Sequence, residues 1–197
     1  ETRFLLWPLI AMSLLLSPWV WAAPHPATSS SLLLQPEKGL FISHKGFQID
    51  AGETNWRQTR PLKNIPSLAT IYRSAEVHNG VQPAVTVRVE SPSRLPSLKR
   101  YVQRWSRDYH RLGLDVIESK PVMIQNQKAY LLDSLNRSAE KRLRQVVFWK
   151  DKMAVILTCR DHVQTFQKTL SKCNEIIRRF RWNKSSPQTI KATGKDS

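Results

Sequence analysis

Residues 142–159 read RLRQVVFWKDKMAVILTC and predict a β-hairpin at the centre of the fold. Residues 142–149 and 153–159 are its two strands, with the turn at Asp151 and Lys152. The run from Met153 to Leu157 is apolar on both faces, which is typical of a strand that is covered on both sides. We therefore expect a sheet with helices on its faces and this hairpin near its middle.

Further strands are predicted on either side of this hairpin. Residues 84–90, AVTVRVE, alternate between apolar and polar side chains, as a half-buried strand does. Residues 116–135 indicate two strands that meet at a tight turn around Asn126. Pro121 cannot donate a hydrogen bond within a sheet, so we expect an edge position or a bulge there. Weaker candidates are 39–42, 46–51 and 68–73.

Two segments have helical periodicity. The first runs from Ser97 to Gly113, with an apolar stripe of Leu98, Tyr101, Val102, Trp105, Tyr109 and Leu112. The second is expected to begin near Asp161 as its N-cap, with a stripe of Val163, Phe166, Leu170, Cys173, Ile177 and Phe180. This order of elements predicts an α+β fold with two main helices on a largely antiparallel sheet.

The order also resembles that of PsbP-like proteins, which include the bacterial DcrB-like envelope proteins. Gly46-Phe47-Gln48-Ile49 followed by Trp56 is similar to the start of these proteins, although their proline before the tryptophan is absent here. The later resemblance rests on three runs: Lys128-Ala129-Tyr130, Val155-Ile156-Leu157-Thr158-Cys159 and Arg179-Phe180-Arg181-Trp182. The resemblance covers residues 39–182. It implies an α/β/α sandwich that works as a binding or assembly module, and it implies no catalytic residues.

The composition bounds the remaining possibilities. An apolar share of 41% in 197 residues can supply the core of one domain. Six glycines form no phosphate-binding loop or dinucleotide fingerprint, and two cysteines are too few for a disulfide scaffold. We predict a single domain over 38–182, a flexible lead-in over 23–37 and a disordered tail over 183–197. We expect no catalytic residues, no metal and no cofactor.

The N-terminal residues predict export. Residues 4–20, FLLWPLIAMSLLLSPWV, carry no charge, and Ala22 or Ala23 offers a cleavage site. This pattern is typical of a secretory signal peptide over 1–22, which places the chain in the periplasm or outside the cell. An uncleaved membrane anchor is the alternative, because the apolar run is about as long as the shortest membrane spans.

Basic residues are the strongest indication of function. The chain carries 31 Lys and Arg against 15 Asp and Glu, a net charge of +16. Arg100, Arg104, Arg107 and Arg111 follow helical spacing and are expected in one stripe, opposite the apolar stripe. We expect Arg142 and Arg144 to extend this basic face. Guanidinium groups bind phosphate and carboxylate in a bidentate geometry. An ordinary solvated helix face is the alternative interpretation.

An exported, non-enzymatic module with this basic face would bind an anionic envelope component or an envelope protein, with peripheral membrane contact as one form of binding. Extracytoplasmic nucleic-acid binding is an alternative that charge alone supports, because no nucleic-acid-binding motif is present.

The two cysteines allow three interpretations. Cys159 and His162, in the run Cys159-Arg160-Asp161-His162, could form the nucleophile and base of a thiol-dependent hydrolase, with Arg160 lowering the pKa of the thiol; this is the enzymatic alternative. If Asp161 caps the second helix, however, His162 would lie on its solvated first turn, away from the thiol. A disulfide from Cys159 to Cys173 would instead fasten this helix to the sheet in an oxidising compartment. Two buried free thiols are the third interpretation.

Overall fold

The computed structural model describes residues 39–60, 65–92 and 97–183, which all lie in one compact unit of the chain. The expected signal peptide 1–22, the lead-in 23–37 and nearly all of the tail 183–197 lie outside these residues. Asn183, placed at the start of the tail, donates its backbone N–H to the Gly46 carbonyl at 2.9 Å.

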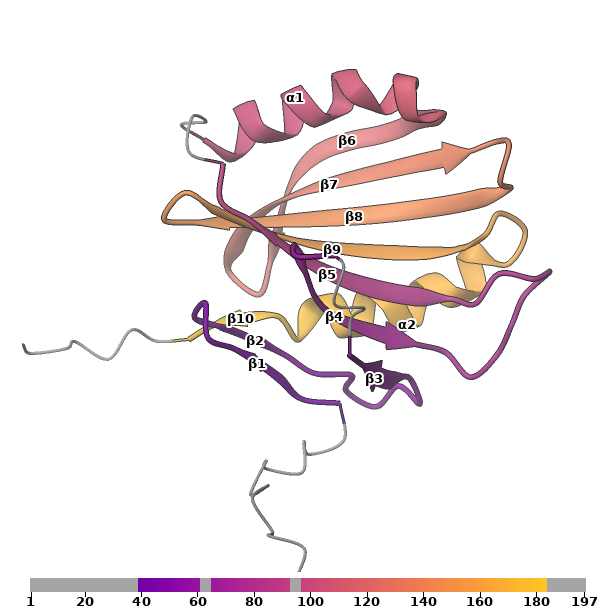
Figure 1. Cartoon of the computed structure of the whole chain (residues 1–197), viewed down its shortest axis with the longest axis horizontal. Helices are drawn as coiled ribbons and strands as arrows, with labels where there is room; N and C mark the ends of the chain where they lie inside the picture. Colours follow the sequence, from indigo (N-terminus) through magenta and orange to yellow (C-terminus); the bar gives the residue numbers. More distant parts are fainter. Residues whose placement is uncertain (1–38, 61–64, 93–96, 184–197) are drawn as a thin grey trace, which may run out of the picture. The chain divides into compact units, whose positions relative to one another are not determined.

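An antiparallel sheet of seven strands is the centre of the described unit (Figure 1). In spatial order its strands are β3 (Arg57–Thr59), β4 (Leu68–Arg73), β5 (Ala84–Glu90), β9 (Met153–His162), β8 (Lys141–Lys150), β7 (Gln127–Asn136) and β6 (Leu114–Ile124). The predicted hairpin is therefore β8–β9, and β9 is the middle strand. Asp151 and Lys152 both have positive φ, 49° and 62°, which matches the right-handed twist of the two strands they join.

The predicted edge position of Pro121 is confirmed, because β6 is the last strand of the sheet. The bulge of β6 does not include Pro121 but lies between Val116 and Glu118. The turn from β6 to β7 falls at Gln125 and Asn126, as the sequence indicates.

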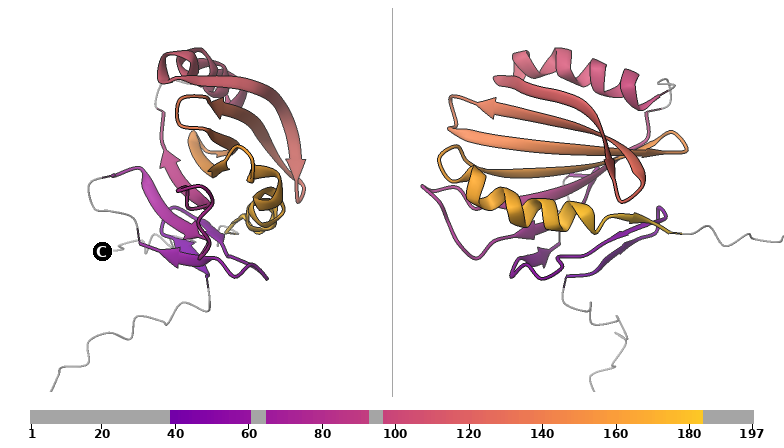
Figure 2. Two further views of the ribbon diagram at one scale, coloured as in Figure 1. Left: turned by 90° about the vertical axis from the view of Figure 1, so that its right-hand side faces the viewer. Right: turned by 180° about the vertical axis from the view of Figure 1, so that it is seen from behind.

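One helix covers each face of the sheet, so the predicted α+β fold with its α/β/α layers is confirmed (Figure 2). Helix α1 (Leu98–Tyr109) continues into the short 3-10 helix η1 (His110–Leu112) and packs on Leu132, Val147 and Ile156. Helix α2 (Phe166–Arg178) packs on the opposite face, against Val155, Leu157 and their neighbours.

A second, three-stranded sheet completes the core beside α2. It consists of β1 (Phe41–Ser43), β2 (Phe47–Ile49) and β10 (Arg181–Trp182). Phe47 and Phe180 are fully buried here, and Phe180 stacks on Phe148 with ring centroids 4.1 Å apart. Two of the weak strand candidates, 39–42 and 46–51, thus belong to this sheet, whereas β3 and β10 are too short to show periodicity in the sequence.

The expected start of the second helix is wrong. Strand β9 continues to His162, because its pairing with β8 extends through Asp161 and His162, and α2 begins at Phe166 after Thr165. Val163 therefore lies outside the helix and is exposed. Leu112 is also misplaced in the first apolar stripe: it lies in η1, past the end of the sheet contact, and is 66% exposed.

Candidate functional site

Helix α1 begins where the sequence indicates, and its continuation η1 ends at the expected Gly113, although α1 itself ends at Tyr109. The Ser97 hydroxyl accepts the Arg100 backbone N–H, and Gly113, with φ of 71°, ends η1 in the left-handed conformation. Tyr101, Val102 and Tyr109 are buried against the sheet. The helix thus keeps a fixed inner face, which decides which side chains point outward.

Two tyrosine hydroxyls anchor α1 to the sheet. Tyr101 donates to Glu90 at 2.7 Å, and Tyr109 donates to the buried Gln145. Burial raises the pKa of both tyrosines, with Glu90 as a further cause for Tyr101, so both hydroxyls stay protonated and remain donors. The Trp105 ring packs between these two tyrosines. The outer face of α1 is therefore presented on a rigid support.

The helical segment exposes four arginines along its outer side: Arg100, Arg104 and Arg107 in α1, and Arg111 in η1. None of them has an acidic partner at salt-bridge distance within residues 39–60, 65–92 and 97–183. We call Arg100, Arg104, Arg107 and Arg111 the α1 arginine row. Like charges at this spacing repel, so the row does not stabilise the helix by itself.

Two hollows lie beside the row, between α1 and the β6–β7 hairpin. One, of about 600 Å³, is lined by Arg100, Arg104 and Arg107 together with Ser119 and Tyr130. The other, of about 640 Å³, is mostly apolar, and it also includes Tyr130. The α1 arginine row therefore borders a concave surface.

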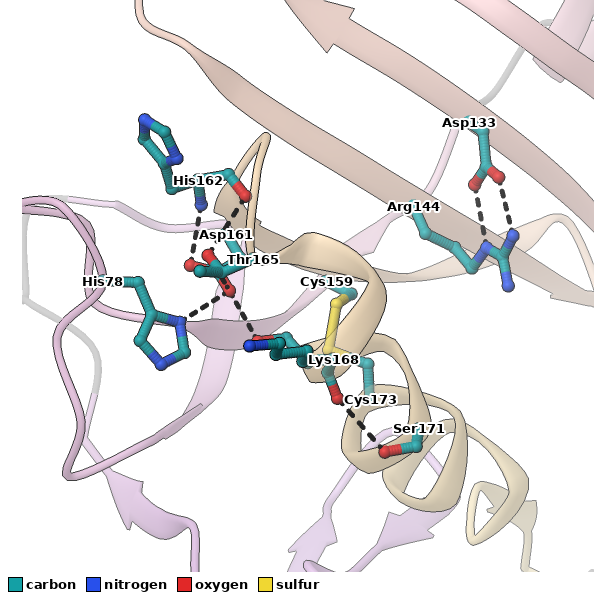
Figure 3. Close-up of a disulfide and its surroundings, with 11 residues drawn as sticks. His78, Asp133, Arg144, Cys159, Asp161, His162, Thr165, Lys168, Ser171 and Cys173 are labelled. Carbon is teal, nitrogen blue, oxygen red and sulfur yellow. Dashed lines mark hydrogen bonds and ion pairs between the residues drawn. A yellow bond between two sulfur atoms is a disulfide. The ribbon is translucent and has the colours of Figure 1, made fainter.

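Arg142 and Arg144 do not join the row. Val147 of β8 faces α1, and successive side chains of a strand point to opposite faces. Arg142 and Arg144, an odd number of residues from Val147, therefore point to the α2 side of the sheet. Arg144 forms two hydrogen bonds with the buried Asp133, at 2.8 and 2.6 Å (Figure 3). These bonds raise the pKa of Arg144. The Arg142 guanidinium lies over the Phe166 ring, 5.4 Å from its centroid.

Other arginines lie on the α1 side of the sheet, where the sequence did not indicate a cluster. Arg57 pairs with Arg73 across β3 and β4, and Ala84 pairs with both Arg73 and Arg160. Burial and the charge of Arg73 lower the pKa of Arg160. Only the strand register brings these residues together, and single strands carry no signal of register.

Cys159 and Cys173 form a disulfide with Cα atoms 5.8 Å apart, which settles the three interpretations (Figure 3). The thiol-dependent hydrolase is wrong, because Cys159 has no thiolate to act as a nucleophile. His162 is not on a solvated helix turn either: it is buried at the end of β9, and its Nε2 lies 3.3 Å from Glu140.

Asp161 is the centre of a buried polar cluster that the sequence did not predict. One of its oxygens accepts from Thr169 at 2.5 Å and Thr165 at 2.9 Å, and lies 2.8 Å from His78 Nδ1. These bonds join the end of β9 to α2 and to the loop before β5. The hydrogen bond to Asp161 is the largest cause of the raised pKa of His78. Across the part of the chain that the structure describes, no three His, Cys, Asp or Glu residues are grouped as a metal site would require.

None of the helices among the described residues is long and apolar enough to span a bilayer.

Two solved structures share this fold. The cyanobacterial PsbP protein CyanoP from Synechocystis sp. PCC 6803 is 12% identical, with a TM-score of 0.54 over 80% of this chain and 99% of that one. The protein PA94 from Pseudomonas aeruginosa, of unknown function, is 13% identical, with a TM-score of 0.50 over 72% of this chain and 94% of that one. No family model and no curated protein matches this chain. The PsbP-like fold that the sequence predicts is thereby confirmed.

Proposed function

We propose that this chain is an exported, non-enzymatic binding module whose α1 arginine row holds an anionic envelope surface or an acidic partner protein. The observation that carries the proposal is the row itself, because its four exposed guanidinium groups have no acidic partner within the described residues. Groups that repel one another gain most from a ligand that neutralises them together.

Two further observations support export and a binding role. The disulfide is typical of proteins that fold in an oxidising compartment, such as the periplasm, and it agrees with the signal peptide expected at residues 1–22. The solved structures of similar fold include an uncharacterised protein and a PsbP protein, a family in which we expect accessory rather than catalytic roles.

Retention on anionic vesicles at increasing salt tests the proposal. Each cation near such a surface contributes about 1 kcal/mol, and the attraction falls within a Debye length of about 8 Å at physiological salt. We expect retention at low salt and its loss at high salt. The double variant Arg104→Glu/Arg107→Glu should weaken retention by more than about thirtyfold, since two attractive charges become repulsive.

The matched control changes the same charge on the other side of the sheet. Lys168 and Lys172 are exposed on α2, and Lys168→Glu/Lys172→Glu alters the net charge by the same amount. We expect this variant to keep most of the retention. Equal loss in both variants would show that net charge, not the row, is responsible. Displacement by single-stranded DNA at equal ionic strength would instead favour nucleic-acid binding.

A further inference from the structure

The two hollows beside α1 differ in chemistry, one apolar and one cationic, and residues that are adjacent in the sequence line them. Lys99 lines the apolar hollow, and the next residue, Arg100, lines the cationic one, while Tyr130 belongs to both. In the β6–β7 pairing Pro121 lies opposite Tyr130, and Met123 lies opposite Lys128, so these four side chains share the sheet face on which α1 packs. The hollows therefore adjoin at Tyr130, and we call the two together the groove.

The apolar end has the features of a small-molecule site. Leu98, Pro121 and Met123 line it, and Met123 is 62% exposed although it lies on a strand. Its volume of about 640 Å³ lies within the usual range of about 300–1,000 Å³ for ligand sites. Lys99 and Lys128 add two cations to its lining. Exposed apolar surface surrounded by polar groups is typical of a binding site.

The cationic end offers donors for an anion. Arg100, Arg104 and Arg107 carry guanidinium groups, which only donate hydrogen bonds, and the hydroxyls of Ser119 and Tyr130 can donate as well. No carboxylate occurs among the residues that line either hollow. A phosphate or carboxylate group would thus meet several donors without repulsion from a lining carboxylate.

From this pairing of charge and apolar surface, we infer that the groove binds a single-chain anionic lipid. Its head group contacts the three arginines, and its alkyl chain lies over Leu98, Pro121 and Met123. The inference rests on the proposed function, because both use the α1 arginine row, and it names the chemical class of the ligand. An extended peptide that adds a strand to β6 fits less well, because Pro121 offers no N–H at this edge.

Calorimetric titration with dodecyl phosphate, kept below its critical micelle concentration, tests the inference on the purified protein. Inorganic phosphate supplies the head without the chain, and dodecyl maltoside supplies the chain without the charge. We expect dodecyl phosphate to bind about a hundredfold more tightly than inorganic phosphate, the effect of burying three to four methylene groups. Dodecyl maltoside should bind at least as weakly as inorganic phosphate.

Variants at the two ends separate the contributions of head and chain. Met123→Asp should weaken the binding of dodecyl phosphate about tenfold or more, because it places a carboxylate where the chain lies. Arg104→Gln should weaken both dodecyl phosphate and inorganic phosphate. Val77→Asp is the matched control, since Val77 is 60% exposed and lies outside the groove, and its affinity should equal that of the unaltered protein. Circular dichroism checks that each variant is folded.

Equal affinity for dodecyl phosphate and inorganic phosphate would overturn the lipid inference, and so would equal losses in Met123→Asp and Val77→Asp. The proposed function would then still stand if the unaltered protein is retained on anionic vesicles in a salt-dependent manner. Absence of both vesicle retention and dodecyl phosphate binding would overturn both proposals.

Discussion

Arg144, on one face of the seven-stranded sheet, and the α1 arginine row, over the other face, have opposite roles. On the α2 face Arg144 binds the buried Asp133, and a disulfide and the Asp161 cluster join α2 to β9. On the α1 face the helix is held by apolar contacts and two tyrosine hydroxyls, while its arginines point outward without acidic partners in the described residues. Charge thus contributes to stability at Arg144 and remains available for a ligand in the α1 arginine row.

Removal of one arginine from each face should give the largest difference in unfolding free energy between two variants. Arg144→Ala leaves Asp133, only 2% exposed, without its partner, and breaking such a buried pair costs about 3–5 kcal/mol of unfolding free energy. Arg104→Ala should change the unfolding free energy by less than about 0.5 kcal/mol, as exposed positions do. Urea unfolding of both variants measures the contrast. A similar cost for both would contradict the division between the faces.

The disulfide should account for the next largest effect. Its removal in Cys159→Ala/Cys173→Ala frees a loop of about 15 residues in the unfolded chain, which corresponds to a loss of about 3 kcal/mol. Because α1 packs on the other face, the folded variant should keep its retention on anionic vesicles. Loss of retention in a variant that circular dichroism shows to be folded would mean that the two faces are coupled.

The His78–Asp161 contact predicts a smaller, pH-dependent contribution on the α2 side. The pKa of His78 is raised above 6.5 in the folded protein, so its protonated form stabilises the fold. This contribution is complete below about pH 6.5 and is lost as the pH rises through the folded pKa. The difference in unfolding free energy between the unaltered protein and His78→Gln should therefore be largest in acid, at about 1.5 kcal/mol.

Glu76, the exposed second partner of His78, provides the control for this pH effect. Glu76 lies 3.3 Å from His78 Nε2 and its side chain is 71% exposed, so Glu76→Gln should cost less than about 0.5 kcal/mol. A difference for His78→Gln that grows with rising pH would show that the sign of the linkage is wrong.

Much of the fold could be predicted from the sequence, because its long elements carry strong periodicity. Local patterns predict the β8–β9 hairpin, the edge position of Pro121 and the limits of the segment formed by α1 and η1. The start of α2 could not be predicted in this way. Asp161 is a good N-cap in isolation, but the ladder between β8 and β9 continues through it, and its carboxylate is buried in side-chain hydrogen bonds instead.

The sequence predicted only the part of the candidate site that lies within a single helical segment. The α1 arginine row follows from helical spacing alone. The side of the sheet to which Arg142 and Arg144 point depends instead on which alternate residues of β8 face α1, and the strand's own sequence does not determine this. The groove beside the row requires residues from α1, β6 and β7 together. Such contacts depend on the crossing of helix and sheet, which no local pattern records.

The smallest predicted effect tests whether the α1 arginine row is retained at a cost to stability. Arg104 has like charges four residues before it and three residues after it, at Arg100 and Arg107, and the opposite charge of Asp108 four residues after it. Each pair contributes about 0.2–0.5 kcal/mol, so one attractive pair offsets part of two repulsive pairs. Arg104→Gln, which keeps a good helix former, should therefore raise the unfolding free energy by about 0.3 kcal/mol at low salt. The gain should vanish near 1 M salt, where the Debye length is about 3 Å.

An exposed arginine with a partner should respond in the opposite direction. Arg137 lies 2.6 Å from Asp115, so Arg137→Gln should lower the unfolding free energy slightly at low salt. If Arg104→Gln also lowers it, the row contributes to folding, and its lack of acidic partners no longer argues for a ligand. If the signs differ as expected, the chain keeps on α1 an arrangement of charge that folding alone does not favour, and an anionic ligand is the factor that would relieve its repulsion.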